Sequence, residues 1–156
     1  MPEGHALGIA VQESFGSFVA EVAEVSIGEE NQPIVHKVTC AVDCGWAVNP
    51  DTVEAQIESG IIFGLTAAMY GEITIENGRV AQSNFPDYEM VRMATSPEIE
   101  VHIVESGESL GGLGEPATPP IAAAVTNAVY ILTGQRVREL PIKNHDFSRS
   151  NPIAQV

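Results

Sequence analysis

Basic residues are scarce in this sequence. Its 156 residues include 7 lysines and arginines against 21 aspartates and glutamates, which gives a formal net charge of −14. Nucleic acids and anionic membrane surfaces are bound by clustered lysine and arginine side chains. The composition therefore argues against a nucleic-acid partner and against an anionic membrane as a binding surface.

Cysteine and long apolar runs are also scarce. Cys40 and Cys44 are the only cysteines, and their spacing is neither a CxxC pair nor half of a four-ligand zinc site. We expect both to be small buried hydrophobic residues. The four histidines are scattered, which predicts no metal held by this chain's own side chains. Apolar stretches end well before about 18 residues, so no membrane span is expected, and the first residues do not resemble a signal peptide.

The sequence does contain enough apolar material for one domain. Hydrophobic residues make up 44% and charged residues 18%, which excludes a disordered chain. We predict one domain over residues 1–147 and a flexible tail over 148–156. Strands are expected at 7–27 (two strands joined around Gly16 and Ser17), 34–43, 98–106 and 136–142. Neither face of the strand ending at 27 is cleanly polar, which predicts that this strand is covered on both sides. With two main helices, this pattern predicts an α+β fold with a mostly antiparallel sheet.

The first helix is predicted over residues 50–70. Asn49 is a suitable N-cap, and Pro50 suits the first helical position. Gly60 and Gly64 lie on its apolar side and weaken the helix by about 1 kcal/mol each relative to alanine. Their presence predicts that another backbone or a ligand approaches the helix closely.

The second helix is predicted between Thr118, as the N-cap, and Gly134, as the C-cap. Asn77-Gly78 predicts a type I′ hairpin turn between the two helices. Trp46 is expected to be a core or loop anchor. Asp43 follows a strand and is expected to form a structural Asx turn.

Residues 110–117 form the most unusual segment, because three glycines fall within four residues ahead of the second helix. Glu115 follows them. It is either an acid placed favourably near the helix dipole or a general base held on a glycine-rich elbow. Gln56, on the first helix one turn before Gly60, is either a solvated polar residue or a donor and acceptor for the edge of a heterocycle. The remaining acids are interpreted as a solvated surface: Glu21, Glu24, Glu29, Glu30, Glu72, Glu76, Glu98, Glu100, Glu105 and Glu108.

Three segments in a fixed order carry a resemblance. AVDCGWAVNPDTVEAQIESGIIFGLTAAMYGEITIENGRV, followed by GGLGEPATPPIAAAVTNAV, resembles the C-terminal end of the molybdenum-binding large subunit of the xanthine dehydrogenase/aldehyde oxidase family. The opening GIAVQESFGSFVAEVAEVSI resembles the isoquinoline 1-oxidoreductase β-subunit branch. The resemblance extends from about residue 4 to residue 142. It departs from many relatives at Ser59, where they have a glycine.

The resemblance implies a molybdenum hydroxylase that oxidises N-heteroaromatic or aldehyde substrates with oxygen from water. It implies that Glu115 is the general base, that Gln56 and Gly114 contact the cofactor region, and that the chain supplies no direct metal ligand. The cofactor would be a molybdopterin, in its cytosine dinucleotide form, and electrons would leave through iron–sulfur clusters on another subunit.

Family members are several times longer, so the resemblance implies a C-terminal piece that is inactive alone. Its partners would be the remainder of the large subunit, a small iron–sulfur subunit and a small-molecule substrate. We also expect exposed apolar surface and self-association of the isolated chain. The alternative is a non-catalytic acidic binding module derived from the same family. The compartment stays open, with a cytoplasmic chain slightly favoured and a periplasmic complete enzyme compatible.

Overall fold

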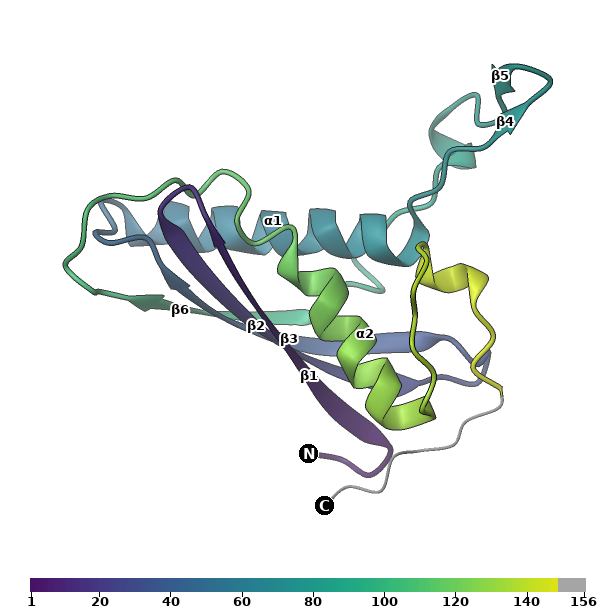
Figure 1. Cartoon of the computed structure of the whole chain (residues 1–156), viewed down its shortest axis with the longest axis horizontal. Coiled ribbons are helices and arrows are strands. Elements are labelled where there is room, and N and C mark those ends of the chain that lie inside the picture. Colours follow the sequence, from purple (N-terminus) through teal and green to yellow (C-terminus); the bar gives the residue numbers. More distant parts are fainter. Residues whose placement is uncertain (149–156) are drawn as a thin grey trace.

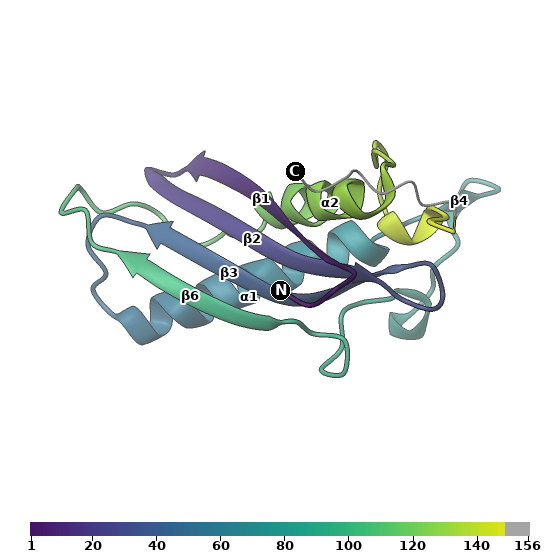
Figure 2. The ribbon, with the colours of Figure 1, turned by 90° about the horizontal axis from the view of Figure 1, so that it is seen from below.

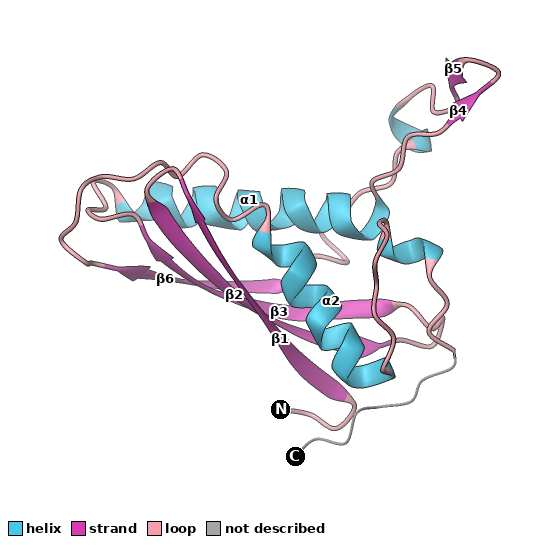
Figure 3. Cartoon of the chain, viewed as in Figure 1, coloured by secondary structure: helices cyan, strands magenta, loops and turns pink. Residues whose placement is uncertain are grey.

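The fold is a four-stranded sheet with two helices packed on one face (Figure 1, Figure 3). The computed structural model describes residues 1–148, so the tail expected from 148 onward lies, except for Ser148, outside the described residues. The elements in chain order are β1 (His5–Ser14), β2 (Ser17–Ile27), β3 (Pro33–Asp43), α1 (Pro50–Tyr70), β4 (Ile75–Glu76), β5 (Arg79–Val80), the 3-10 turn η1 (Phe85–Asp87), β6 (Glu98–Val104), α2 (Pro120–Thr133) and the 3-10 turn η2 (Ile142–Asn144).

The sheet has the strand order β1-β2-β3-β6. β1 pairs with β2 and β2 pairs with β3 in antiparallel fashion, whereas β6 is parallel to β3. The parallel pair follows from the connection, because the chain crosses over through α1 before it returns as β6. The predicted α+β class with a mostly antiparallel sheet is confirmed.

The predicted helix boundaries are confirmed at three of the four ends. The Asn49 side chain accepts a hydrogen bond from the backbone N–H of Thr52 at 3.3 Å, which caps α1. Gly134 ends α2 with a φ of 71°. The prediction of Thr118 as the N-cap of α2 is wrong: Thr118 donates its backbone N–H to the Glu115 carbonyl within a preceding turn, and α2 begins only at Pro120.

Two further expectations are corrected by the structure. Residues 136–142 do not form a strand, because no strand of the described chain pairs with them and the 3-10 turn η2 begins at Ile142. Trp46 is not a core anchor: it is 65% exposed, at the rim of a groove described below. Cys40 and Cys44 are buried free thiols, as predicted.

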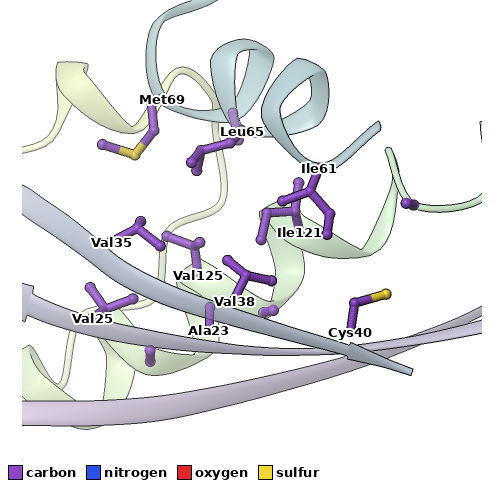
Figure 4. Close-up of a cluster of buried hydrophobic side chains, with 14 of the residues drawn as sticks. Ala23, Val25, Val35, Val38, Cys40, Ile61, Leu65, Met69, Ile121 and Val125 are labelled. Carbon is purple, nitrogen blue, oxygen red and sulfur yellow. The ribbon is translucent and has the colours of Figure 1, made fainter. Parts of the chain in front are cut away.

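The core lies between the sheet and the two helices, where β-branched side chains of the strands face aliphatic side chains of α1 and α2 (Figure 4). The residues at its centre include Val25, Val35, Val38, Ile61, Leu65, Ile121 and Val125. Glycines allow the elements to approach closely. A Cβ at Gly8 of β1 would fall 2.0 Å from the carbonyl oxygen of Ala124 in α2, and one at Gly64 of α1 would fall 2.3 Å from that of Thr118.

The opposite face of the sheet is not covered by any helix of residues 1–148 (Figure 2). Its β1–β2 half is apolar and exposed, with Leu7, Ile9, Val11 and Phe18 each 47–67% accessible. Its β3–β6 half is charged, and Lys37 forms ion pairs with Glu98 and Glu100 there. The prediction that β2 is covered on both sides therefore fails within the described chain.

The Asn77-Gly78 turn is confirmed, since both residues have positive φ, and it joins the two-residue strands β4 and β5. This hairpin projects from the body of the domain beyond the end of α1 (Figure 1). Within residues 1–148, no helix has the length and apolar character needed to cross a membrane.

Candidate active-site groove

The glycine-rich loop at 110–114 is tied to two distant parts of the sheet. Gly111 donates its N–H to the Cys44 carbonyl at 2.9 Å, and Gly112 donates to the Phe15 carbonyl at 2.8 Å. The Ser17 hydroxyl donates to the Gly112 carbonyl at 2.8 Å. These bonds fix the loop against the end of β3 and the β1–β2 turn, so it is a held elbow.

Glycine is required in this elbow by space. A Cβ at Gly111 would lie 2.2 Å from the Ser17 hydroxyl oxygen, and one at Gly112 would lie 2.9 Å from the Phe15 Cβ. At Gly114, by contrast, a Cβ would meet nothing within 4 Å. The first two glycines therefore serve the packing of the loop, whereas Gly114 borders open space.

Gln56 joins the first helix to this elbow. Its side-chain amide donates to the Gly114 carbonyl at 2.6 Å, a short bond between residues 58 positions apart. The side chain is exposed, so its amide oxygen stays accessible to a ligand. The structure thus brings together Gln56 and Gly114, two of the three residues that the sequence singled out.

Glu115 stands on a turn that packs against α1. The turn is closed by the Thr118 N–H, which donates to the Glu115 carbonyl at 2.9 Å. Ala117 is buried, and a Cβ at Gly60 would lie 3.1 Å from the Ala117 Cβ. Gly60 and Gly64 therefore have the predicted function of admitting another backbone. The backbone of Glu115 is positioned by this contact rather than by the start of α2, which lies five residues further on and opens with prolines that lack an N–H.

Glu115, Gln56 and Gly114 line one groove of about 530 Å³, which we call the Glu115 groove. Its lining comes from β1 and the following turn, from α1 and from the 114–119 turn: Gln12, Ser14, Phe15, Gln56, Ser59, Gly60, Phe63, Gly114, Glu115, Thr118 and Pro119. The Glu115 side chain is exposed in it. An exposed carboxylate on a held backbone can accept a proton from a ligand in the groove.

A second groove of about 490 Å³, which we call the Trp46 groove, shares Gln56 and Gly114 with the first. Gln56 and Gly114, joined by their hydrogen bond, therefore separate the two grooves. The other lining residues are Cys44, Trp46, Val48, Asn49, Thr52, Val53, Leu110, Gly111 and Leu113. This lining is mostly apolar with a few amide and hydroxyl groups, which suits a flat heterocycle.

Neither groove contains a lysine, arginine or histidine in its lining. No cluster of three metal-ligating side chains occurs among residues 1–148. The amide and hydroxyl groups of Asn49, Thr52 and Gln56 in the Trp46 groove fit the uncharged, planar part of a pterin cofactor. Positive charge for its phosphate groups is not provided by these lining residues.

Asp43 is structural, as predicted. Its Oδ1 accepts hydrogen bonds from the Gly45 N–H at 2.9 Å and from the Ser106 hydroxyl at 2.8 Å. The first bond closes the Asx turn after β3, and the second ties that turn to the segment after β6. Asp43 thereby stabilises the approach to the glycine-rich loop.

The prediction that Glu21 belongs to the solvated surface is wrong, because its side chain is fully buried. Neither carboxylate oxygen has a hydrogen-bond partner in the described chain, and burial raises the pKa of the group to about 8. The same environment raises the pKa of the Cys40 thiol to about 12, chiefly by burial and further by the nearby Glu21. The strand alternation contains the missed signal, because Glu21 falls in step with the buried Val19 and Ala23.

Comparison with known proteins identifies the fold. A family model described as a molybdopterin cofactor-binding domain matches residues 9–97. The aldehyde oxidoreductase of Desulfovibrio desulfuricans superimposes with a TM-score of 0.70 at 24% identity, over 87% of this chain and 16% of that one. The architecture is thus that of part of a molybdenum-cofactor domain. The chain belongs to the molybdopterin cofactor-binding domain family.

Sequence relatives agree with this assignment. The chain is 40% identical over 154 residues to the isoquinoline 1-oxidoreductase subunit beta of Brevundimonas diminuta, which covers 97% of this chain and 20% of the relative. It is 33% identical over 115 residues to the xanthine dehydrogenase molybdenum-binding subunit of Escherichia coli O157:H7, covering 69% of this chain and 15% of the relative. The predicted resemblance is confirmed. The chain spans a fifth or less of the length of these relatives.

Proposed function

We propose that this chain is part of a molybdenum-dependent oxidoreductase that hydroxylates N-heteroaromatic or aldehyde substrates, with Glu115 as the general base. Gln56 and Gly114 would contact the molybdopterin, in its cytosine dinucleotide form. The remainder of the large subunit and an iron–sulfur subunit that accepts the electrons would complete the enzyme. The chain alone would be inactive.

The observation that carries this proposal is the convergence of Glu115, Gln56 and Gly114 on one groove. A general base must reach the proton that it removes, and its position must not change from one encounter to the next. The elbow and the turn support this role, because the carboxylate is exposed while its backbone is fixed by hydrogen bonds and by contact with α1. The relatives named above are molybdenum-binding or oxidoreductase subunits, which agrees with this use of the groove.

Each residue has a distinct part in this chemistry. The molybdenum cofactor, when bound, supplies the two-electron oxidation. Glu115 accepts a proton at a carboxylate oxygen within the Glu115 groove. Gln56 holds the Gly114 carbonyl with one N–H, and its remaining amide atoms would hold the cofactor from the wall of the Trp46 groove. The apolar side chains that line that groove would contact the flat face of the cofactor.

The test is Glu115→Gln in the assembled enzyme. The substitution keeps the size of the side chain and removes its basicity, so turnover should fall by about 10²-fold or more while molybdenum content stays at the wild-type level. Glu108→Gln is the matched control, since Glu108 is exposed in the same loop and lines neither groove. Wild-type rates in Glu115→Gln would reject the role of Glu115.

Metal analysis of the 156-residue chain tests whether its site is complete. We expect no molybdenum in the chain purified alone and stoichiometric molybdenum after assembly with the rest of the enzyme. Retention of molybdenum by the chain alone would contradict the proposal that other segments supply most cofactor contacts. A chain that binds neither molybdenum nor any enzyme subunit would favour the non-catalytic module.

A further inference from the structure

Glu21 is the one fully buried carboxyl group among residues 1–148, and the function proposed above does not use it. Buried polar atoms in native proteins are almost always hydrogen-bonded, because leaving them unpaired costs free energy. Both oxygens of Glu21 are nevertheless without a partner. An orphaned group of this kind calls for a partner that the domain supplies in its working state.

The surroundings of Glu21 define its protonation. Ala10 of β1 lies directly opposite it, and Cys40 lies opposite it on β3. The buried faces of α1 and α2, which pack on this side of the sheet, contribute aliphatic residues, glycine, proline, methionine and a single threonine, and no charged group. With a pKa near 8 caused by burial, and the Cys40 thiol neutral, Glu21 holds its proton at neutral pH and is a hydrogen-bond donor.

Gln12 is the polar side chain nearest to Glu21 in the register. It faces Val19 on β2, so it is the diagonal neighbour of Glu21 on the same, helix-covered face of the sheet. Diagonal neighbours in an antiparallel pair lie about 7–8 Å apart at the backbone, within reach of two long side chains. Gln12 also lines the Glu115 groove.

The Gln12 amide is weakly held in the present arrangement. Its only hydrogen bond in the described chain runs from Nε2 to the Glu13 carbonyl at 3.4 Å, which is long for an N–H···O bond. The amide can therefore turn at little cost. Hydrogen bonds in enzyme sites are often loose without ligand and shorten when one binds.

We propose that Glu21 is a positioning residue of the Glu115 groove: its neutral carboxyl group donates to Oε1 of Gln12 and thereby turns the Gln12 N–H groups toward the ligand. The ligand class that this arrangement recognises is one with a hydrogen-bond acceptor beside the reacting carbon, such as a ring nitrogen or a carbonyl oxygen. The inference rests on the proposed function, because it assumes that substrate occupies the Glu115 groove.

The experiment is a double-mutant cycle in the assembled enzyme with Glu21→Met, Gln12→Ala and both together. Each single substitution should raise KM about tenfold with kcat changed less than about twofold, because one hydrogen bond to the ligand is lost. The double variant should also show about a tenfold increase, since both changes remove the same contact. Glu21→Gln keeps a neutral donor and should retain a KM within about twofold of the wild type.

The pH profile adds a readout that a purely structural role would not move. The wild-type KM should rise as pH passes about 8, where Glu21 loses the proton that it donates, and Glu21→Gln should remove this rise. If Glu21→Met fails to fold, the comparison of the wild type with Glu21→Gln still tests the positioning role of Glu21. Glu13→Gln is the control, because Glu13 is exposed on the other face of β1.

The proposal is overturned if the two single effects on KM multiply to about a hundredfold in the double variant, or if Glu21→Gln keeps the wild-type pH dependence of KM.

Infrared spectra of the 156-residue chain give a readout that needs no activity. The wild-type spectrum should contain a band from a neutral carboxyl group, and this band should be absent from the spectrum of Glu21→Gln. The two proposals can fail separately. If Glu115→Gln is fully active while Gln12 and Glu21 remain coupled in the double-mutant cycle, the base role of Glu115 is refuted. If Glu115→Gln is inactive while Gln12 and Glu21 show no coupling, only the positioning role of Glu21 is refuted.

Discussion

Gly64→Ala is predicted to destabilise the domain and to move the turn that carries Glu115. A Cβ at position 64 would lie 2.3 Å from the Thr118 carbonyl oxygen and 2.8 Å from Cγ2 of Ile121. The first contact is with backbone that is tied to Glu115 by a hydrogen bond, so it cannot be relieved by turning a side chain. The turn at 115–118 must therefore shift away from α1.

The magnitude follows from two opposing effects. Alanine is favoured over glycine in a helix interior by about 1 kcal/mol. Overpacking a tight contact costs about 1–3 kcal/mol, and contact with backbone belongs at the upper end of that range. The expected net loss in free energy of unfolding is about 1–2 kcal/mol. At Gly60 the nearest atom is the Ala117 Cβ at 3.1 Å, a contact that small shifts relieve, so Gly60→Ala should be neutral within about 0.5 kcal/mol.

Urea denaturation of both variants and the wild type, followed by circular dichroism, measures the difference. Equal m-values are required for the comparison, because a changed m-value would signal a different unfolding reaction. The assembled Gly64→Ala enzyme should also lose turnover through displacement of Glu115. A Gly64→Ala variant as stable as Gly60→Ala, with full activity, would refute the argument that Gly64 positions the turn.

Two more predictions concern stability and association. The pKa of Glu21 is about 8 in the folded domain and 4.5 for the free group. Between these pH values the folded state binds more protons than the unfolded state, so the free energy of unfolding falls as pH rises, by about 1.4 kcal/mol per pH unit. Glu21→Gln should remove this slope in denaturation curves measured from pH 5 to 8, and an unchanged slope would contradict a buried acid. On the uncovered sheet face, Ile9→Lys with Val11→Lys should shift the isolated chain from self-associated to monomeric in sedimentation. A wild-type chain that is monomeric at high concentration would contradict that expectation.

Local signals allowed much of the fold to be predicted. Asn49 with Pro50 marked the start of α1, and Asn77-Gly78 marked the hairpin, because caps and turns depend on a few neighbouring residues. Gly60 and Gly64 predicted a close approach without indicating what approached. The approaching turn lies more than fifty residues later in the chain, and no local pattern identifies it.

The errors come from contacts that are distant in sequence or that local patterns allow in two ways. Residues 136–142 alternate as a strand would, but a strand needs a neighbour to pair with, and no sheet edge of the described chain pairs with this segment. Thr118 is a good N-cap by type, but its N–H closes the turn that carries Glu115. Glu21 shares the periodicity of the buried residues Val19 and Ala23, but a carboxyl group is costly to bury, so its residue type and its position in the strand point in opposite directions.

The position of Glu115 and the charge needed by an anionic cofactor have separate origins. The carboxylate is placed by this domain alone, since the elbow is bonded to Cys44 and Phe15 and the turn packs on Gly60 and Gly64. The grooves on either side of the Gln56–Gly114 bond have no cationic side chain in their linings, and the whole chain has a net charge of −14. Backbone N–H groups can offset part of a phosphate's charge, and under the proposed function the rest would come from residues elsewhere in the enzyme. An exposed carboxylate on a fixed backbone, with no cationic side chain beside it, is what the proposed function expects of a domain that contributes one wall of a site shared by several segments.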